Sequence, residues 1–134
     1  TTDVFQLATA VLFQNPIQNF ALAPNNLTDA PQICLDFMKT IPTEWDEIRY
    51  IDGYPGKYVV LARRNGEKWY VAAINAEKST LKLNVDLSFL DGKTVKWYDD
   101  DKNLQPQLTE KKLKAGKPVR LTLASEGGVV IVAE

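Results

Sequence analysis

The side chains that could do chemistry are few, and the two most common catalytic types are almost absent. The 134 residues include no histidine and a single cysteine, Cys34. Histidine is the most frequent general base, and a thiolate zinc site needs several cysteines. The composition therefore excludes Ser-His-Asp and Cys-His catalysis, an intrachain disulfide and a cysteine zinc cluster. Cys34 lies at helical spacing from other apolar residues, so we interpret it as a small buried hydrophobe.

A first group of carboxylates surrounds Trp45 and comprises Glu44, Asp46 and Glu47. Glycoside hydrolysis uses two carboxyl groups about 5 to 10 Å apart, one of which its surroundings keep protonated. In a β-strand Glu44 and Asp46 would share a face, but nothing in the surrounding sequence would raise a pKa. We expect surface carboxylates and predict no catalytic residue in this chain.

A second group is the consecutive run Asp99, Asp100 and Asp101, with Asn103 nearby. Calcium binds six to eight oxygen ligands, and these side chains would supply some of them. The glycine and the terminal glutamate of an EF-hand loop are missing at the required spacing. The sequence therefore favours a solvated turn, and we predict no metal site and no cofactor here.

The aromatic residues allow two interpretations. Trp45, Trp69 and Trp97 are of the type that stacks on the C–H faces of sugar rings, so they are candidate sugar-stacking residues. The same residue types are also common in a buried core, where they would be covered by other side chains. Adjacent strand residues such as Trp69 and Tyr70 point to opposite faces, so at most one of the two lies in a given core.

Charge and hydropathy restrict the partners. There are 16 Lys and Arg residues against 17 Asp and Glu, and the basic residues are interspersed among the acidic ones. Nucleic acid binding requires a concentrated positive surface, so we expect no nucleic-acid partner. No apolar run approaches the roughly 18 to 20 residues of a membrane span, so we expect none.

The apolar spacing divides the chain in two. Apolar residues at helical spacing predict a helix over 3–13, and a second helix is expected over 29–40, where Pro31 fits the first turn and Pro42 follows the end. After Pro42 the period changes from about 3.6 to 2. We therefore predict a helical segment over 1–40 and a β-domain over 41–134.

The β-domain is predicted to be an antiparallel β-sandwich. Short strands are separated by turn signals, with no long helix between them. Asn65-Gly66 between two apolar runs predicts a hairpin with a two-residue type I′ turn, and 109–118 is expected to be a polar loop. The seven expected strands cover 47–52, 57–64, 68–75, 80–88, 93–99, 118–124 and 129–134.

Several segments together resemble one enzyme family. "FMKTIPTEWDEIRYIDGYPGKYVVLARRNGEKWYVAAIN" at 37–75 and "VDLSFL" at 85–90 are similar, in order and approximate spacing, to the C-terminal end of glycoside hydrolase family 97, the bacterial α-glucosidase and α-galactosidase family. The resemblance is continuous from about Leu7 to Leu90 and weaker to Glu134. "NPIQN", at 15–19, replaces the family's "SPLQM"-like segment, a difference that concerns packing.

The resemblance implies a mainly β fold, with two N-terminal helices left over from the end of a catalytic (β/α)₈ barrel. It implies a noncatalytic C-terminal domain that packs on that barrel, inactive alone, in a periplasmic or secreted parent enzyme. The catalytic carboxylates and the calcium ligands of the family would lie outside these residues. The first helix would then need a new partner or would lie on the sandwich, and a homodimer through the N-terminal helices is expected.

Two other functions stay open at this stage. The chain could be a carbohydrate-binding module that uses exposed Trp and Tyr residues. It could also be a small autonomous enzyme, although that would need a nucleophile or an acid–base pair that the sequence does not offer.

Overall fold

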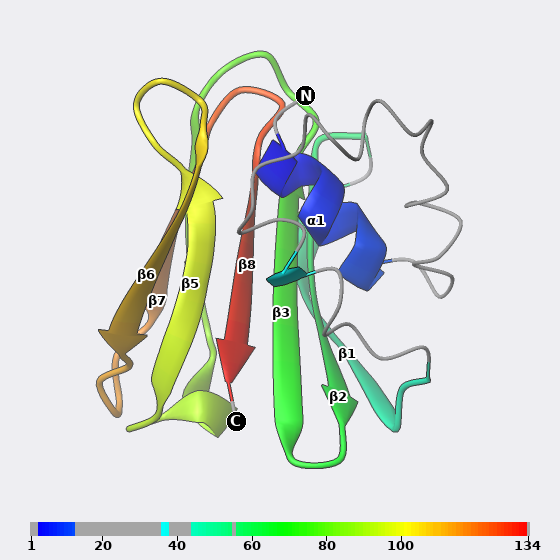
Figure 1. The fold of residues 1–134 in the computed structure, drawn as a ribbon, viewed down its shortest axis with the longest axis vertical. Coiled ribbons are helices and arrows are strands. Elements are labelled where there is room, and N and C mark those ends of the chain that lie inside the picture. Colours follow the sequence, from blue (N-terminus) through cyan, green and yellow to red (C-terminus); the bar gives the residue numbers. More distant parts are fainter. Residues whose placement is uncertain (1–2, 13–35, 38–43, 55, 134) are drawn as a thin grey trace.

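A computed structural model describes residues 3–12, 36–37, 44–54 and 56–133 (Figure 1). Eight strands, one α-helix and one short 3₁₀ helix make up the described part of the chain. In chain order the elements are α1 (Asp3–Leu12), β1 (Glu47–Tyr54), β2 (Tyr58–Asn65), β3 (Lys68–Asn75), β4 (Leu81–Val85), η1 (Ser88–Leu90), β5 (Thr94–Asp100), β6 (Pro106–Lys112), β7 (Val119–Leu123) and β8 (Gly128–Ala133).

The strands form two antiparallel sheets. The larger sheet has the order β1-β2-β3-β8-β5-β6, and β4 pairs with β7 in a sheet of two strands. The small sheet covers one face of the large sheet, and α1 lies across β3 and β8 on the other face (Figure 1). The prediction of a mainly β antiparallel sandwich is confirmed.

The main core lies between the two sheets. β4 and β7 alternate in burial, because Leu83 and Val85 face inward with Leu121 and Leu123 while the residues between them face solvent. From the large sheet, the buried residues Val71, Trp97 and Ile131 meet them. This alternation is what a sheet with one wet face requires.

A second apolar cluster lies on the opposite face of the large sheet. There the buried residues Tyr70, Tyr98 and Val130 pack with Phe37 and with α1. The middle strands are therefore buried on both faces, and every residue of β8 is buried. Burial on both faces explains why the apolar runs of β3 and β8 are nearly continuous instead of alternating.

The apolar face of α1 is buried and packs on the large sheet. Val4, Leu7, Ala8 and Val11 have no exposed surface. The backbone of the helix passes close to Gly128, where an added Cβ would lie 3.1 Å from the Cα of Phe5, 3.1 Å from the Val4 carbonyl oxygen and 3.0 Å from the Ala73 carbonyl oxygen of β3. Glycine at this position is what allows the helix to lie this close to β8.

The buried Asn75 closes one end of the sandwich. Its amide nitrogen donates hydrogen bonds to the carbonyl oxygens of Ser79 at 2.8 Å and Ala124 at 3.1 Å, and its amide oxygen accepts one from the Glu77 N–H at 2.9 Å. The Asn75 N–H donates to the Gly127 oxygen at 2.9 Å. One side chain thus joins the end of β3 to the connection between β7 and β8.

The predicted hairpin is confirmed, and one predicted loop is wrong. β2 and β3 pair up to Asn65 and Lys68, so the two turn residues are Gly66 and Glu67. Of these only Gly66 has a positive φ, 60°, so the predicted type I′ turn at Asn65-Gly66 is wrong and the turn is of the kind with glycine in its first position. The segment 109–118 was expected to be a loop, but residues up to Lys112 belong to β6, an eighth strand. β6 is an edge strand with six of its seven residues exposed, so it lacks the apolar alternation that marks a buried strand.

The helix pair is confirmed only as far as α1. The second predicted helix falls mostly outside the described residues, and only Asp36 and Phe37 of it are described, in helical conformation. The predicted domain boundary at 40 and 41 also lies outside them and stays a prediction. Glu44 and Asp46 precede β1, so the expectation that they share a strand face is wrong.

We expect Gly128→Val to displace α1. The new side chain would meet the backbone of Val4 and Phe5, and overpacking of this kind costs about 1–3 kcal/mol of unfolding free energy. Urea unfolding would measure the loss, and amide hydrogen exchange would show faster exchange in α1 than in β4. The exposed Lys82→Ala should leave both unchanged. Equal stability of the valine variant and the parent chain would contradict the close approach.

Candidate functional site

Two of the three candidate sugar-stacking residues are core residues. Trp69 and Trp97 have 9% and 4% of their surface exposed and lie in the cluster between the sheets. The Trp69 ring packs against Phe89 at 4.7 Å between centroids, and the guanidinium of Arg49 covers it at 5.1 Å. The Nζ of Lys111 lies 4.1 Å from the centre of the Trp97 ring. Neither ring offers an open face to a sugar, so their positions do not support the sugar-stacking prediction.

Trp45 is half-buried on the helix-bearing face of the large sheet. Its ring meets Tyr70 edge to face at 5.3 Å, and the guanidinium of the buried Arg63 lies 5.7 Å from its centre. Burial lowers the pKa of Arg63, because desolvation disfavours a charge. The indole ring therefore covers a buried cation of its own chain. The three tryptophans are not brought together as one site.

The carboxylates around Trp45 are used to fasten the β2–β3 hairpin. Asp46 accepts a hydrogen bond from the Gly66 N–H at 2.7 Å, and the Glu44 carbonyl oxygen accepts one from Asn65 at 3.0 Å. Glu47 accepts hydrogen bonds from the Nε of Arg49 at 2.7 Å and of Arg64 at 3.4 Å. The hydrogen bond from Arg49 lowers the pKa of Glu47, with a further contribution from Arg64. A lowered pKa keeps this carboxyl ionised, which is the opposite of what a general acid needs.

Asp99 and Asp100 are the last residues of β5, so only Asp101 of the aspartate run lies in the turn between β5 and β6. Asp101 accepts hydrogen bonds from the backbone N–H groups of Asn103 at 2.8 Å and Gln105 at 3.1 Å, as an Asx turn does. Asp100 accepts one from the Gly128 N–H at 3.3 Å. Within the described residues no three His, Cys, Asp or Glu side chains converge in a way that could hold a metal ion.

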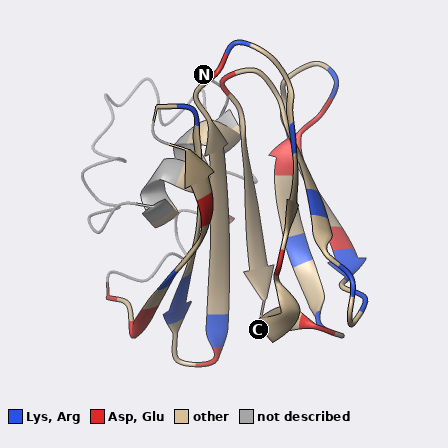
Figure 2. Cartoon of the chain, turned by 180° about the vertical axis from the view of Figure 1, so that it is seen from behind, with Lys and Arg blue, Asp and Glu red and all other residues tan. Residues whose placement is uncertain are grey.

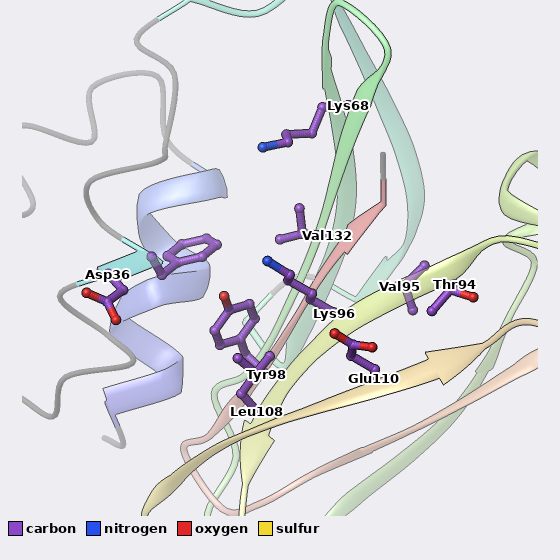
Figure 3. A pocket seen from close by; sticks show the side chains of 10 residues that line it. Asp36, Lys68, Thr94, Val95, Lys96, Tyr98, Leu108, Glu110 and Val132 are labelled. Atoms are coloured by element: carbon purple, nitrogen blue, oxygen red, sulfur yellow. The ribbon is translucent and has the colours of Figure 1, made fainter.

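A hollow of about 340 Å³ lies beside α1, between Phe37 and the strands β5 and β6 (Figure 3). Asp36 and Glu110 lie on opposite sides of it, with Lys68, Lys96 and Tyr98 between them. Lys96 faces Glu110 in register across the two strands, and the Tyr98 ring packs on Phe37 at 5.1 Å. The two carboxylates therefore do not form a catalytic pair.

Sequence reasoning missed the exposed tyrosines of β1. Tyr50 and Tyr54 have 66% and 56% of their surface exposed. They line a shallow hollow of about 350 Å³ next to Tyr58 and Ile74. The only available signal was the spacing Tyr50, Tyr54, Tyr58 around Gly53 and Gly56, which does not by itself reveal exposure.

Within the described residues, no helix has both the length and the apolar content that a membrane span requires. The described residues form a packed sandwich with shallow hollows on its surface. Among these residues, no acid, base and nucleophile are brought together.

Comparison with known protein families identifies the family of this chain. Residues 44–134 match the family described as the C-terminal, oligomerisation domain of glycosyl hydrolase 97. The chain belongs to this family. The resemblance seen in the sequence is thereby confirmed, and the match covers the whole β-sandwich.

Several known glycoside hydrolases are similar to this family 97 C-terminal domain in sequence or in structure. A retaining α-galactosidase of Bacteroides thetaiotaomicron is 40% identical over 89 residues, which are 66% of this chain and 13% of that protein. The crystal structure of a β-arabinopyranosidase is 61% identical, with a TM-score of 0.92, over 98% of this chain and 21% of the other. A family 97 enzyme of a Pseudoalteromonas strain, in complex with acarbose, is 25% identical with a TM-score of 0.77 over 100% of this chain and 22% of the other. The chain thus spans between an eighth and a quarter of these relatives.

Removing a buried tryptophan should cost stability. We expect Trp97→Ala to lose about 3–5 kcal/mol of unfolding free energy in urea, because a large ring leaves the core. Trp97→Phe should lose less, since it keeps most of the ring and the indole Nε1 has no hydrogen-bond partner among the described residues. A stable alanine variant that has lost affinity for α-galactosides would contradict the core position.

The ion pairs of Glu47 should make stability depend on pH. Because its pKa is lowered in the folded state, its contribution is fully present above the ordinary value of 4.5 and is lost as the pH falls through the folded value. Glu47→Gln should therefore be less stable than the parent chain at pH 7, and the difference should vanish in more acidic solution. A gap for Glu47→Gln that widens in acid would refute the assignment.

Proposed function

We propose that the domain has a structural role in a longer glycoside hydrolase. It would support association between copies and cover one flank of a catalytic (β/α)₈ barrel in the same polypeptide. The observation that carries the proposal is the family match over the complete sandwich, with a description that names oligomerisation. The engagement of Asp46, Glu47 and Asp101 in local hydrogen bonds supports a noncatalytic role.

α1 is the element that we propose to lie between the sandwich and a barrel. An outer-ring helix of such a barrel buries one side against the strands and has neighbours on its flanks. In this chain the face formed by Val4, Leu7, Ala8 and Val11 is packed on the sandwich. We propose that α1 is the last outer helix of the barrel and connects the two domains rigidly.

A homodimer through the N-terminal helices was the sequence-based expectation. The apolar face of α1 that is described here already has the large sheet as its partner. Association of copies through this face would require α1 to leave the sheet, at the cost of the second apolar cluster. We therefore look for the contact between copies elsewhere on the domain.

The relatives suggest a substrate class for the whole protein. Two of them are named as an α-galactosidase and a β-arabinopyranosidase, and the latter shares 61% of its residues with this chain in the aligned region. We propose that the parent enzyme hydrolyses α-galactosides or β-arabinopyranosides, with α-glucosides as the other family possibility. The barrel pocket would choose between a pentose and a hexose ring by the space it leaves for the exocyclic hydroxymethyl group.

Two further expectations concern the parent enzyme. Calcium, if the whole enzyme binds it, would be held outside this chain, because the acidic side chains described here are dispersed or engaged in turns. We also propose, on the family resemblance, that the whole protein is periplasmic or secreted, which cell fractionation tests.

The test of the substrate proposal compares the whole enzyme with this chain. We expect nitrophenyl α-galactoside or β-arabinopyranoside to be turned over by the whole enzyme and by none of the preparations of residues 1–134. Nitrophenyl β-glucoside serves as the control glycoside. Turnover by the isolated chain above the level of heat-denatured protein would overturn its noncatalytic role, and turnover of α-glucoside alone by the whole enzyme would overturn the proposed substrate.

A further inference from the structure

Positive charge is concentrated at the connection between β6 and β7. The segment 111–120 carries five basic residues and no acidic one, although acidic residues outnumber basic ones in the whole chain. All five line a hollow of about 280 Å³, and Figure 2 shows blue at this connection; they are Lys111, Lys112, Lys114, Lys117 and Arg120. A surface with one sign of charge raises the local concentration of oppositely charged groups.

The loop that carries Lys114 and Lys117 is fastened to the connection before β5. The Leu113 N–H donates to the carbonyl oxygen of Lys93 at 2.9 Å, and the Leu113 carbonyl oxygen accepts a hydrogen bond from the Gly92 N–H at 2.8 Å. Further along the loop, the Gly116 N–H donates to the carboxylate of Asp91 at 3.3 Å. Because the backbone of the loop is already held, a ligand that binds its lysines needs to order only their side chains.

The five cations have no acidic partner in the part of the chain that the structure describes. The ion pairs between described residues join Arg49, Lys57 and Arg64 to carboxylates elsewhere. The acid that precedes the segment, Glu110, lies opposite Lys96 in the register of β5 and β6, on the helix-bearing face. The positive charge at the hollow is therefore not neutralised locally.

The Trp97 ring forms part of the wall of this hollow. Lys111 lies opposite Val95 in the register, so it shares the face of β5 on which Trp97 lies, and its Nζ is 4.1 Å from the centre of the indole ring. The buried indole Nε1 has no hydrogen-bond partner among the described residues. An indole N–H can only donate, and lysine and arginine have no acceptor either. The polar groups of the hollow thus all suit a ligand made of acceptors with negative charge.

We infer that this hollow binds the carboxylate groups of an acidic polysaccharide. We define the basic recess as the hollow at the β6–β7 connection together with its five cationic side chains. That the anion belongs to a polysaccharide rests on the proposed function, because a domain that holds a polymer keeps its glycosidic bonds near the catalytic barrel of the same polypeptide. The recess recognises charge, and no stacking on an open aromatic ring is involved.

Two other anionic partners suit the basic recess less well. A membrane surface would require exposed apolar side chains beside the cations. Of the exposed leucines on this side, Leu108 lies opposite Tyr98 on the helix-bearing face, and Leu104 lies at the other end of β6. Nucleic acid is bound by neutralising many phosphates along a strand, which requires a longer positive surface than one recess.

The first experiment titrates residues 1–134 with polygalacturonate, a polymer of galactose-type units that each carry a carboxylate, by calorimetry at low salt. We expect saturable binding that weakens as NaCl is added, because salt screens exposed charges. Lys114→Gln/Lys117→Gln should raise the Kd about tenfold or more. The matched control, Lys78→Gln/Lys102→Gln, removes the same charge from exposed positions at the other end of the sandwich and should leave the Kd nearly unchanged. Urea unfolding checks that each variant is folded.

A second measurement needs no change in the recess. In an NMR titration of the parent chain with polygalacturonate, the indole N–H signal of Trp97 should shift, because Lys111 lies against its ring. The indole signals of Trp45 and Trp69 should stay in place, since neither residue lines the hollow. Loss of one signal in Trp97→Phe assigns it.

The outcomes separate the basic recess from the proposed function. An equal loss of affinity in both double variants, or equal binding of a neutral galactan, would overturn recognition of carboxylates by the recess. No binding of polygalacturonate at any salt concentration would also overturn it, while turnover of glycosides by the whole enzyme would still support the proposed function. Tighter binding of a DNA duplex, or of vesicles of phosphatidylserine and phosphatidylcholine, would identify another partner and overturn the inference.

Discussion

The structure depends on the burial of the six-stranded sheet on both faces. β3 and β8 meet the small sheet on one side and α1 on the other, so their side chains fill two separate apolar clusters. Each apolar side chain of a central strand contributes on the order of 1.5–3 kcal/mol when fully buried. The close approach of α1 requires a residue without a side chain at Gly128. The helix is therefore part of the folded body.

Double-sided burial also decides what the aromatic residues do. Once Trp69 and Trp97 fill the space between the sheets, and Trp45 covers the buried Arg63, none of them is arranged as an open ring platform. The rings that reach solvent are Tyr50 and Tyr54, on a terminal strand where one flank has no neighbour in the sheet. Asp46 and Asp101 are likewise engaged locally, because each accepts a hydrogen bond from a backbone N–H group of a turn. The domain is built for packing and contact, in agreement with the family to which it belongs.

A noncatalytic domain with this construction changes how mutations in it should be interpreted. Changes at Asn75, Trp97 or Gly128 act on stability, because these residues join elements that are distant in sequence.

The sequence by itself determined the β-sandwich class, the Asn65-Gly66 hairpin, the helix at the start of the chain and the family, because these follow from local spacing and from segments in a fixed order. By composition it also excluded catalysis by histidine, an intrachain disulfide and a cysteine zinc cluster. It did not reveal β6, since an edge strand with exposed residues such as Lys111 shows no apolar period. Tertiary structure alone decided which face of the sheet α1 covers and which aromatic rings are buried. It also decided that β1, which carries Tyr50, is a terminal strand of the large sheet. Those outcomes depend on contacts between residues far apart in the chain, and local spacing carries no information about such contacts.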